Sequence, residues 1–270
     1  MNFGPGSSLR VIGHRGAAGV APENTLPALR HAVAVGAHAV EFDIRCTGDG
    51  QLVVLHDPGV DRTTDGSGRI DEMTLPEVRE LDAGYRFTPD RGRTFPFRGG
   101  GVRIPTLDEA FAGIGDLPAV VEIKSARAGD VLPAWLEGRD VAHRMLLGSF
   151  SRRALRPSAD RVGRSSASEE ELRPYVLLGK IGLAGAAVPA AEAVMVPERY
   201  RGFRIVTRRF VRRAHRDGLG VFVWTVNRPD AMRRLWEWGV DGLISDNPAR
   251  ALRILWERIA GGAPDERQHE

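Results

Sequence analysis

Short apolar runs alternate with longer amphipathic stretches along most of the chain. The short runs are rich in Val, Ile, Leu and Ala, which is typical of buried strands. The longer stretches repeat apolar residues with the period of a helix. This pattern predicts strands at residues 10–13, 39–44, 119–123, 145–148, 162–165, 193–196, 220–224 and 242–244.

Helices are predicted in the stretches between these strands. When each strand is followed by a crossover helix, the strands form a parallel sheet. Eight such units, in a chain close to the length of about 250 residues typical of a barrel, predict an α/β fold of the (β/α)8 TIM-barrel type. The predicted helices are residues 25–35, 107–113, 131–136, 151–158, 168–178, 207–217, 229–238 and 248–259.

One segment interrupts the alternation after the second strand. Residues 57–105 are rich in Gly, Pro and Arg, with one further helix predicted at residues 75–81. A barrel needs few residues at this point, and long insertions are usually functional. We therefore expect this insertion to form part of the wall over a pocket. The barrel should span residues 9–260, with flexible tails at 1–8 and 261–270.

Composition narrows the classes of protein that the chain can belong to. The net charge is +3, and only Lys124 and Lys180 among the 38 basic residues are lysines. This balance is weak evidence for nucleic acid, and we expect none as a partner. A lone cysteine, Cys46, cannot form an intrachain disulfide. No apolar run is long enough for a membrane helix and no secretory signal is recognised, so we expect a cytoplasmic protein without stable membrane insertion.

Ionisable residues gather where the predicted strands end. Glu41 and Asp43 lie two residues apart on one strand, so both side chains point to the same face, about 7 Å apart. Glu122 and Lys124 repeat this spacing on the next strand. Three carboxylates at one rim repel one another unless a cation joins them, and oxygen ligands favour Mg²⁺ or Ca²⁺ over zinc. The alternative is a salt bridge from Lys124 that neutralises them without metal.

Two histidines flank this acidic cluster. His14 follows the first predicted strand, and His56 precedes Asp57, which could orient it. Two imidazoles beside carboxylates suit general acid–base catalysis near neutral pH. Arg15 offers a planar guanidinium for a phosphate group. The alternative is a structural role, since a lone histidine is more often structural than catalytic.

These residues occur within ordered motifs that resemble the glycerophosphodiester phosphodiesterase family. The resemblance spans residues 11–249 and includes the sequences HRG at 14–16, PENT at 22–25, EFDI at 41–44, HD at 56–57, RTTDG at 62–66, EIK at 122–124, WTVN at 224–227 and DNP at 246–248. It implies a metal-assisted barrel hydrolase that splits glycerophosphodiesters into glycerol 3-phosphate and an alcohol.

The same resemblance implies a role for each site residue. The catalytic histidines fall on His14 and His56. The metal ligands fall on Glu41, Asp43 and Glu122, and the residues that bind the substrate and its phosphate fall on Arg15, Lys124 and Trp224. The segments 125–144 and 162–171 depart from the family pattern, which leaves the outer pocket wall and the alcohol group undefined.

Several alternatives stay open at the level of sequence. The same barrel could carry a lysophospholipase D-like or phosphoinositide phospholipase-like activity, given an apolar path near the insertion, or it could bind glycerophosphodiesters without cleaving them. The attacking group could be water or the glycerol 2-hydroxyl, and either histidine could be the acid. The alcohol group, the choice between Mg²⁺ and Ca²⁺, the oligomeric state and the pathway are not predicted.

An arginine-rich stretch follows the sixth predicted strand. Residues 199–216 contain eight arginines, with Glu198 just before them. We interpret residues 207–217 as a solvated outer helix, with Phe210, Val211 and Ala214 facing the barrel. The alternative interpretation is attraction to anionic lipid or nucleic acid.

Overall fold

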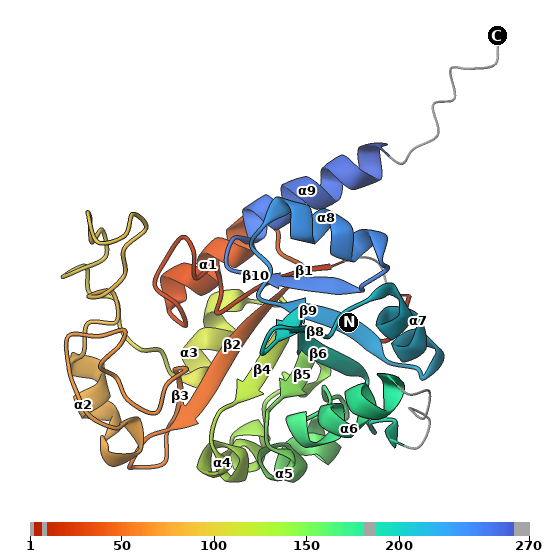
Figure 1. Cartoon of the computed structure of the whole chain (residues 1–270). Coiled ribbons are helices and arrows are strands. Elements are labelled where there is room, and N and C mark those ends of the chain that lie inside the picture. Colours follow the sequence, from red (N-terminus) through yellow and green to blue (C-terminus); the bar gives the residue numbers. More distant parts are fainter. Residues whose placement is uncertain (1–2, 7–9, 181–186, 262–270) are drawn as a thin grey trace.

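Seven parallel strands curl around a common centre (Figure 1). A computed structural model describes residues 3–6, 10–180 and 187–261. The strands run in the order β5-β4-β2-β1-β10-β9-β6, and every neighbouring pair is parallel. Their bounds are β1 Arg10–Gly13, β2 Ala39–Cys46, β4 Ala119–Ile123, β5 Met145–Gly148, β6 Ala193–Pro197, β9 Gly220–Trp224 and β10 Gly242–Ser245.

The ring closes through a very short segment between β5 and β6. Ser165 bridges to Leu147 of β5, and Ser166 bridges to Ala193 of β6, both in parallel. The strand predicted at 162–165 is therefore wrong in extent. The preceding helix continues to Val162 and ends at Gly163, whose φ of 69° stops it, so only two serines are left to pair. The (β/α)8 barrel is confirmed.

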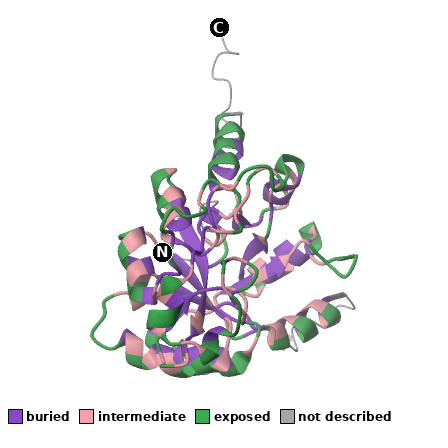
Figure 2. Cartoon of the chain, turned by 90° about the vertical axis from the view of Figure 1, so that its left-hand side faces the viewer, coloured by how far each residue is buried: buried purple, intermediate pink, exposed green. Residues whose placement is uncertain are grey.

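Helices cover the outside of the sheet and bury their apolar faces against it, while their outer faces stay exposed (Figure 2). All eight predicted helices are present. The third predicted helix begins five residues before its predicted start, because Ser125 caps it by accepting a hydrogen bond from the Ala128 N–H group. The bounds are α1 Leu26–Ala34, α3 Leu107–Ile114, α4 Ala126–Leu136, α5 Arg152–Val162, α6 Glu169–Lys180, α7 Arg208–Arg216, α8 Pro229–Glu237 and α9 Pro248–Gly261.

Apolar side chains from the barrel strands fill the interior of the barrel. Phe3 belongs to this cluster, is fully buried, and packs against Phe222 with 5.5 Å between the ring centroids. Its backbone N–H donates to Glu192. The flexible tail expected at 1–8 is therefore wrong for the described residues 3–6, because a single aromatic residue anchors them. The tail expected at 261–270 lies outside the described residues after Gly261.

The insertion forms a small lobe with its own core at the side of the barrel (Figure 1). The segment just before it forms β3, Leu52–Val54, which pairs antiparallel with β2. A short 3-10 helix, η1 (Ile70–Glu72), and α2 (Leu75–Glu80) follow, so the predicted helix at 75–81 is confirmed. Ile70 and Val78 are among the buried residues of the lobe.

Besides η1, a second 3-10 helix and a hairpin were not predicted from the sequence. A second 3-10 helix, η2 (Ala142–Arg144), leads into β5. A hairpin of β7 (Arg199–Tyr200) and β8 (Phe203–Arg204) follows β6. None of the described helices is long and apolar enough to cross a membrane.

Candidate active site

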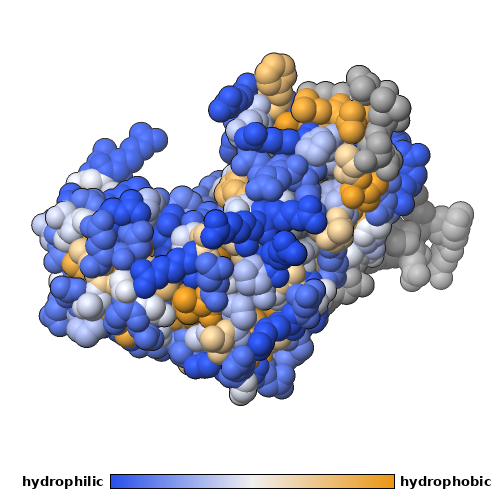
Figure 3. Space-filling model, turned by 90° about the horizontal axis from the view of Figure 1, so that it is seen from below, coloured by the Kyte–Doolittle hydropathy of each residue, from blue (hydrophilic) through white to orange (hydrophobic). Residues whose placement is uncertain are grey.

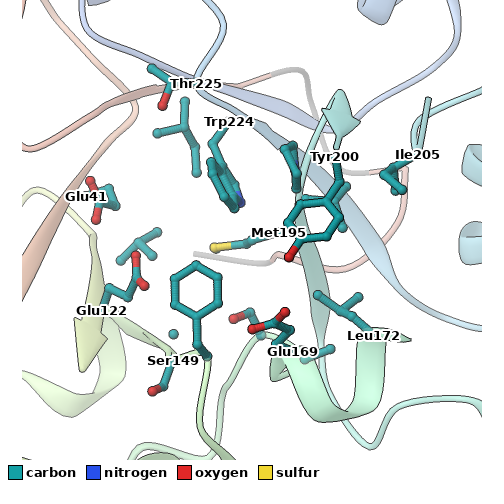
Figure 4. A pocket seen from close by; sticks show the side chains of 18 of the residues that line it. Glu41, Glu122, Ser149, Glu169, Leu172, Met195, Tyr200, Ile205, Trp224 and Thr225 are labelled. Atoms are coloured by element: carbon teal, nitrogen blue, oxygen red, sulfur yellow. The ribbon is translucent and has the colours of Figure 1, made fainter. Parts of the chain in front are cut away.

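A cavity of about 430 Å³ lies at the carboxyl ends of the barrel strands (Figure 4). Glu41 and Glu122 lie at one side of it, Leu172, Tyr200 and Ile205 lie at the other, and Trp224 lies between. Seven of the eight residues predicted for the site line this cavity, and Asp43 is buried directly beside them. The lining residues among the predicted set are His14, Arg15, Glu41, His56, Glu122, Lys124 and Trp224.

Three carboxylates converge at the polar side of the cavity. Glu41 and Asp43 come from β2, and Asp43 lies level with Glu122 of β4 in the strand register. One oxygen of each of the three lies within 4.8 Å of the others. Lys124 contacts two of them, with its Nζ 2.7 Å from Glu122 Oε1 and 3.0 Å from Asp43 Oδ1. The salt bridge from Lys124, which the sequence left as the alternative to a bound cation, is thus formed with two of the three carboxylates.

The two carboxylates of β2 differ in their electrostatic balance. Burial and the charge of Asp43 raise the pKa of Glu41 to about 8. Burial also raises the pKa of Asp43, but Lys124 and Arg15 outweigh it and hold that pKa below its usual range. Arg15 and Lys124 form ion pairs with Asp43, whereas the basic side chain that pairs with Glu41 among the described residues is His14, 4.0 Å away. A buried carboxylate in need of positive charge, within a cluster of oxygen ligands, fits a divalent cation.

His14 is held by a carboxylate that directly follows the last strand of the barrel. Its Nδ1 lies 2.6 Å from Asp246 Oδ1, and its Nε2 lies 4.0 Å from Glu41 Oε2. Burial lowers the pKa of His14, but the hydrogen bond to Asp246 and the charge of Glu41 outweigh burial and raise it overall. Asn227 fixes Asp246 in turn, because its Nδ2 donates to Asp246 Oδ2 over 2.5 Å.

His56 has the same arrangement, built from the insertion. Its Nδ1 lies 2.5 Å from Asp57 Oδ1, and Arg62 donates to the other oxygen of Asp57. Burial raises the pKa of Asp57, but hydrogen bonds from Arg62 and His56 outweigh it and lower the pKa to about 2. Arg62 also binds both oxygens of Glu23, so the insertion is joined to the first loop of the barrel.

Arg15 lies in the loop between β1 and α1, deep among carboxylates. Its Nη1 donates to Glu23 Oε1 over 2.6 Å, and its Nε lies 3.2 Å from Asp43 without the geometry of a hydrogen bond. Its backbone N–H donates to Glu41. Burial lowers the pKa of Arg15, but the charges of Asp43 and Glu23 outweigh burial and raise it, so the guanidinium is charged.

Similarity to a known protein family identifies this site. The family model described as "Glycerophosphoryl diester phosphodiesterase family" matches residues 14–250. The chain belongs to this family. The matched span contains every residue of the site. The predicted family and fold are confirmed, as is the hydrolysis of glycerophosphodiesters by a phosphoric diester hydrolase.

Similar proteins cover nearly the whole length of this family member. A glycerophosphodiester phosphodiesterase of Caldanaerobacter subterraneus is 34% identical over 91% of this chain and 97% of its own. A crystal structure of a glycerophosphodiester phosphodiesterase from Agrobacterium tumefaciens has a TM-score of 0.71 and 26% identity, covering 91% of this chain and 99% of its own. An Oleispira antarctica phosphodiesterase in complex with the product sn-glycerol-3-phosphate has a TM-score of 0.73 and 26% identity, covering 91% and 96%.

Besides Arg62, four residues of the phosphodiesterase site were not among those predicted. Glu23 and Asn24 belong to the PENT motif, and Asn24 donates to Asp43 over 2.8 Å. Asn227 and Asp246 end the seventh and eighth strand motifs and hold His14. Their positions at strand ends were a signal that the sequence offered. What was missing was a reason to pair Asp246 with His14, 232 residues away.

The apolar side of the cavity comes from an unexpected part of the phosphodiesterase. Among the described residues, those of 57–105 do not line the cavity, so the insertion does not form the wall expected of it. It reaches the site from the side, through Asp57 and Arg62. The wall is built by one face of α6, the β7–β8 hairpin and two aromatic rings, Phe150 and Trp224, whose centroids lie 6.3 Å apart.

Proposed function

We propose that this chain hydrolyses glycerophosphodiesters with a divalent cation, Mg²⁺ or Ca²⁺, held by Glu41, Asp43 and Glu122. The observation that carries the proposal is the meeting of this buried carboxylate cluster with two carboxylate-bound imidazoles at one side of one cavity. Ligands that are all oxygen favour a hard ion of this kind. When bound there, such a cation would supply Lewis-acid polarisation of a phosphoryl oxygen.

The side chains around the cluster divide the remaining tasks. Arg15 and Lys124 are charged and buried beside the carboxylates, so they compensate negative charge on the phosphate. One histidine takes the proton of the attacking hydroxyl, and the other gives a proton to the departing alkoxide. Both imidazoles line the cavity and use Nδ1 to bind a carboxylate, which directs the Nε2 atoms to these tasks. Trp224 offers a flat wall beside the substrate.

Release of glycerol 3-phosphate from glycerophosphocholine tests the role of the cation. We expect turnover to stop in chelator and to return with Mg²⁺ or Ca²⁺. Glu41→Gln, Asp43→Asn and Glu122→Gln should each lower kcat at least about a hundredfold, because a metal contributes several kcal/mol to the transition state. Glu169→Gln is the matched control, since Glu169 lines the opposite side of the same cavity. Full activity in chelator after prolonged dialysis would refute the proposal.

The apolar wall supports a second candidate function, lysophospholipase D-like cleavage. Leu172, Val176 and Leu177 on α6 face the cavity together with Ile205 and Tyr200. An acyl chain lying along them would gain about 0.8 kcal/mol for each buried CH₂ group. We therefore expect Val176→Asp to lower kcat/KM for lysophosphatidylcholine more than for glycerophosphocholine. Equal losses for both substrates would favour the short-chain diester alone.

A further inference from the structure

Exposed hydrophobic side chains are concentrated at the mouth of the active-site cavity. Eight large hydrophobic residues are exposed in the described chain, and four of them line this one cavity. Phe203 and Tyr200, on the β7–β8 hairpin, are 69% and 46% exposed, and Leu177 on α6 is 63% exposed. Figure 3 shows that hydrophobic side chains gather in places on one face of the molecule, among strongly hydrophilic ones. Such clusters mark surfaces that bind a protein or a membrane.

Positive charge surrounds the same hydrophobic residues. The hairpin and the helix after it contain eight arginines and no acidic residue between residues 199 and 216. Arg204 lies 3.7 Å from Glu198, but within the described residues no ion pair involves Arg201, Arg208 or Arg209, and all three are exposed. The hairpin leaves the carboxyl end of β6 and α7 begins directly after it, so these arginines lie at the end of the barrel that carries the cavity.

The position of two of these arginines opposes the stability of their own helix. Arg208 and Arg209 occupy the first turn of α7, which contains no acidic residue. Positive side chains are unfavourable at a helix N-terminus, because the helix dipole is positive there. The rim therefore carries a concentrated positive charge that does not stabilise the fold. An anionic partner would relieve it.

We propose that this rim, made of Leu177, Tyr200, Phe203 and the arginines 201, 208 and 209, docks on the surface of an anionic lipid bilayer. Aromatic side chains settle at the level of the lipid headgroups, and arginines attract the anionic leaflet. A surface with both features binds lipid through buried apolar area and charge together. Docking in this orientation would hold the cavity mouth against the membrane. The proposal concerns binding, so it stands or falls independently of hydrolysis.

Vesicle sedimentation tests this proposal. The full chain is mixed with vesicles of phosphatidylcholine alone, or of equal parts phosphatidylcholine and phosphatidylglycerol, at low and high salt. We expect binding to the mixed vesicles, weakened by salt. The triple variant Arg201→Gln/Arg208→Gln/Arg209→Gln should lose about a hundredfold in partitioning, since each arginine near an anionic leaflet contributes about fivefold. Its turnover of glycerophosphocholine in solution should be unchanged.

Matched variants separate docking from general charge. Arg30→Gln/Arg216→Gln/Arg258→Gln removes the same charge from exposed arginines outside the rim, and should bind mixed vesicles nearly as well as the original chain. Phe203→Ser should weaken the binding that persists at high salt. The proposal is overturned if the original chain does not sediment with mixed vesicles, or if the two triple variants lose binding equally. It is also overturned if light scattering shows a dimer that Phe203→Ser dissolves while vesicles are not bound.

Discussion

Two histidines at the cavity share one arrangement, although they come from different parts of the chain. Each places Nδ1 about 2.5–2.6 Å from a carboxylate oxygen, of Asp246 for His14 and of Asp57 for His56. A carboxylate in this position fixes the proton on Nδ1 and the orientation of the ring, which is the arrangement that the proposed proton transfer through the other nitrogen requires. The symmetry of the pair supports a division into an acid and a base.

Removing either imidazole distinguishes the two tasks. We expect His14→Ala and His56→Ala each to lower kcat for glycerophosphocholine by about 10²–10⁴-fold, the usual contribution of one general acid or base. A nitrophenyl diester leaves without protonation, so it should restore activity to the variant that lacks the acid and not to the variant that lacks the base. The measurement is kcat for both substrates in both variants. Equal restoration of both, or of neither, would point instead to a shared role in binding phosphate.

Ionisation of Asp57 makes the stability of the folded chain depend on pH in acid. Its pKa is lowered to about 2, because the hydrogen bonds from Arg62 and His56 outweigh the opposing effect of burial. An unfolded aspartate titrates near 3.9, so the ionised form stabilises the folded chain above about pH 4, and this contribution is lost as the pH falls to about 2. The difference in free energy of unfolding between the original chain and Asp57→Asn should be constant near neutral pH and shrink below about pH 4. Urea unfolding between pH 2 and pH 7 measures it. A difference independent of pH would contradict this account.

Most of the site could be predicted from local patterns, and the rest depends on distant contacts. Glu41 and Asp43 share a face because strand side chains alternate, and His56 lies next to its own carboxylate in sequence. The pairing of Arg62 with Glu23 joins residues 39 positions apart, and no periodicity reports it. Its effect is large, because it links the insertion to the loop that carries Arg15.

Among the elements, the connection from β1 to α1 is the tightest part of the site. Gly16 has a φ of 84°, and a Cβ atom placed on it would lie 2.5 Å from the backbone carbon of Ala28 in α1. Its N–H donates to the Glu41 carbonyl on β2. This close approach sets Arg15 over the carboxylates. Only glycine meets both demands, the positive φ and the missing side chain.

Substitution of Gly16 should therefore be much more harmful than substitution of an ordinary turn glycine. We expect Gly16→Ala to lower the free energy of unfolding by ~2–4 kcal/mol, from left-handed strain together with a clash against a helix backbone. Gly36→Ala is the matched control, because Gly36 has a φ of 77° but nothing within 4 Å of the position that an added methyl group would take. It should cost only about 1 kcal/mol. Equal losses in denaturant unfolding would show that the contact with α1 is not the cause.

The elements that sequence patterns predicted are those with a strong apolar period. The predicted strand at 162–165 was wrong in extent because Ser165 and Ser166 pair by single bridges, which leaves no apolar run to detect. The β7–β8 hairpin was not predicted for a related reason: each of its strands has two residues, and all of these residues are exposed. Phe3 was missed because one aromatic residue in a stretch rich in Gly and Ser has no period at all. Each failure concerns an element that has no apolar period of its own.

For the molecule as a whole, the barrel brings negative charge from several strands to one end of the sheet. Glu41, Asp43 and Glu122 lie within 4.8 Å of one another there, and only the last two contact Lys124. Folding therefore assembles a repulsion that the unfolded chain does not have, and any cation that binds only the folded state relieves it. Binding of this kind is linked to global stability through mass action.

A divalent cation should consequently stabilise the entire fold, apart from any effect on turnover. At a concentration 100 times its Kd, such a ligand adds about 2.7 kcal/mol to the free energy of unfolding. For a chain of this size that corresponds to a rise in Tm of roughly 5–10 °C, at about 2–4 °C per kcal/mol. Calorimetric scans with Mg²⁺, Ca²⁺ and an equal ionic strength of NaCl measure the rise and show which ion is preferred. In Glu41→Gln/Asp43→Asn the rise should vanish, whereas Glu169→Gln should keep it, since Glu169 lies across the cavity from the cluster. A rise of the same size in NaCl, or in the double variant, would mean that the stabilisation comes from general screening and that the three carboxylates do not hold an ion.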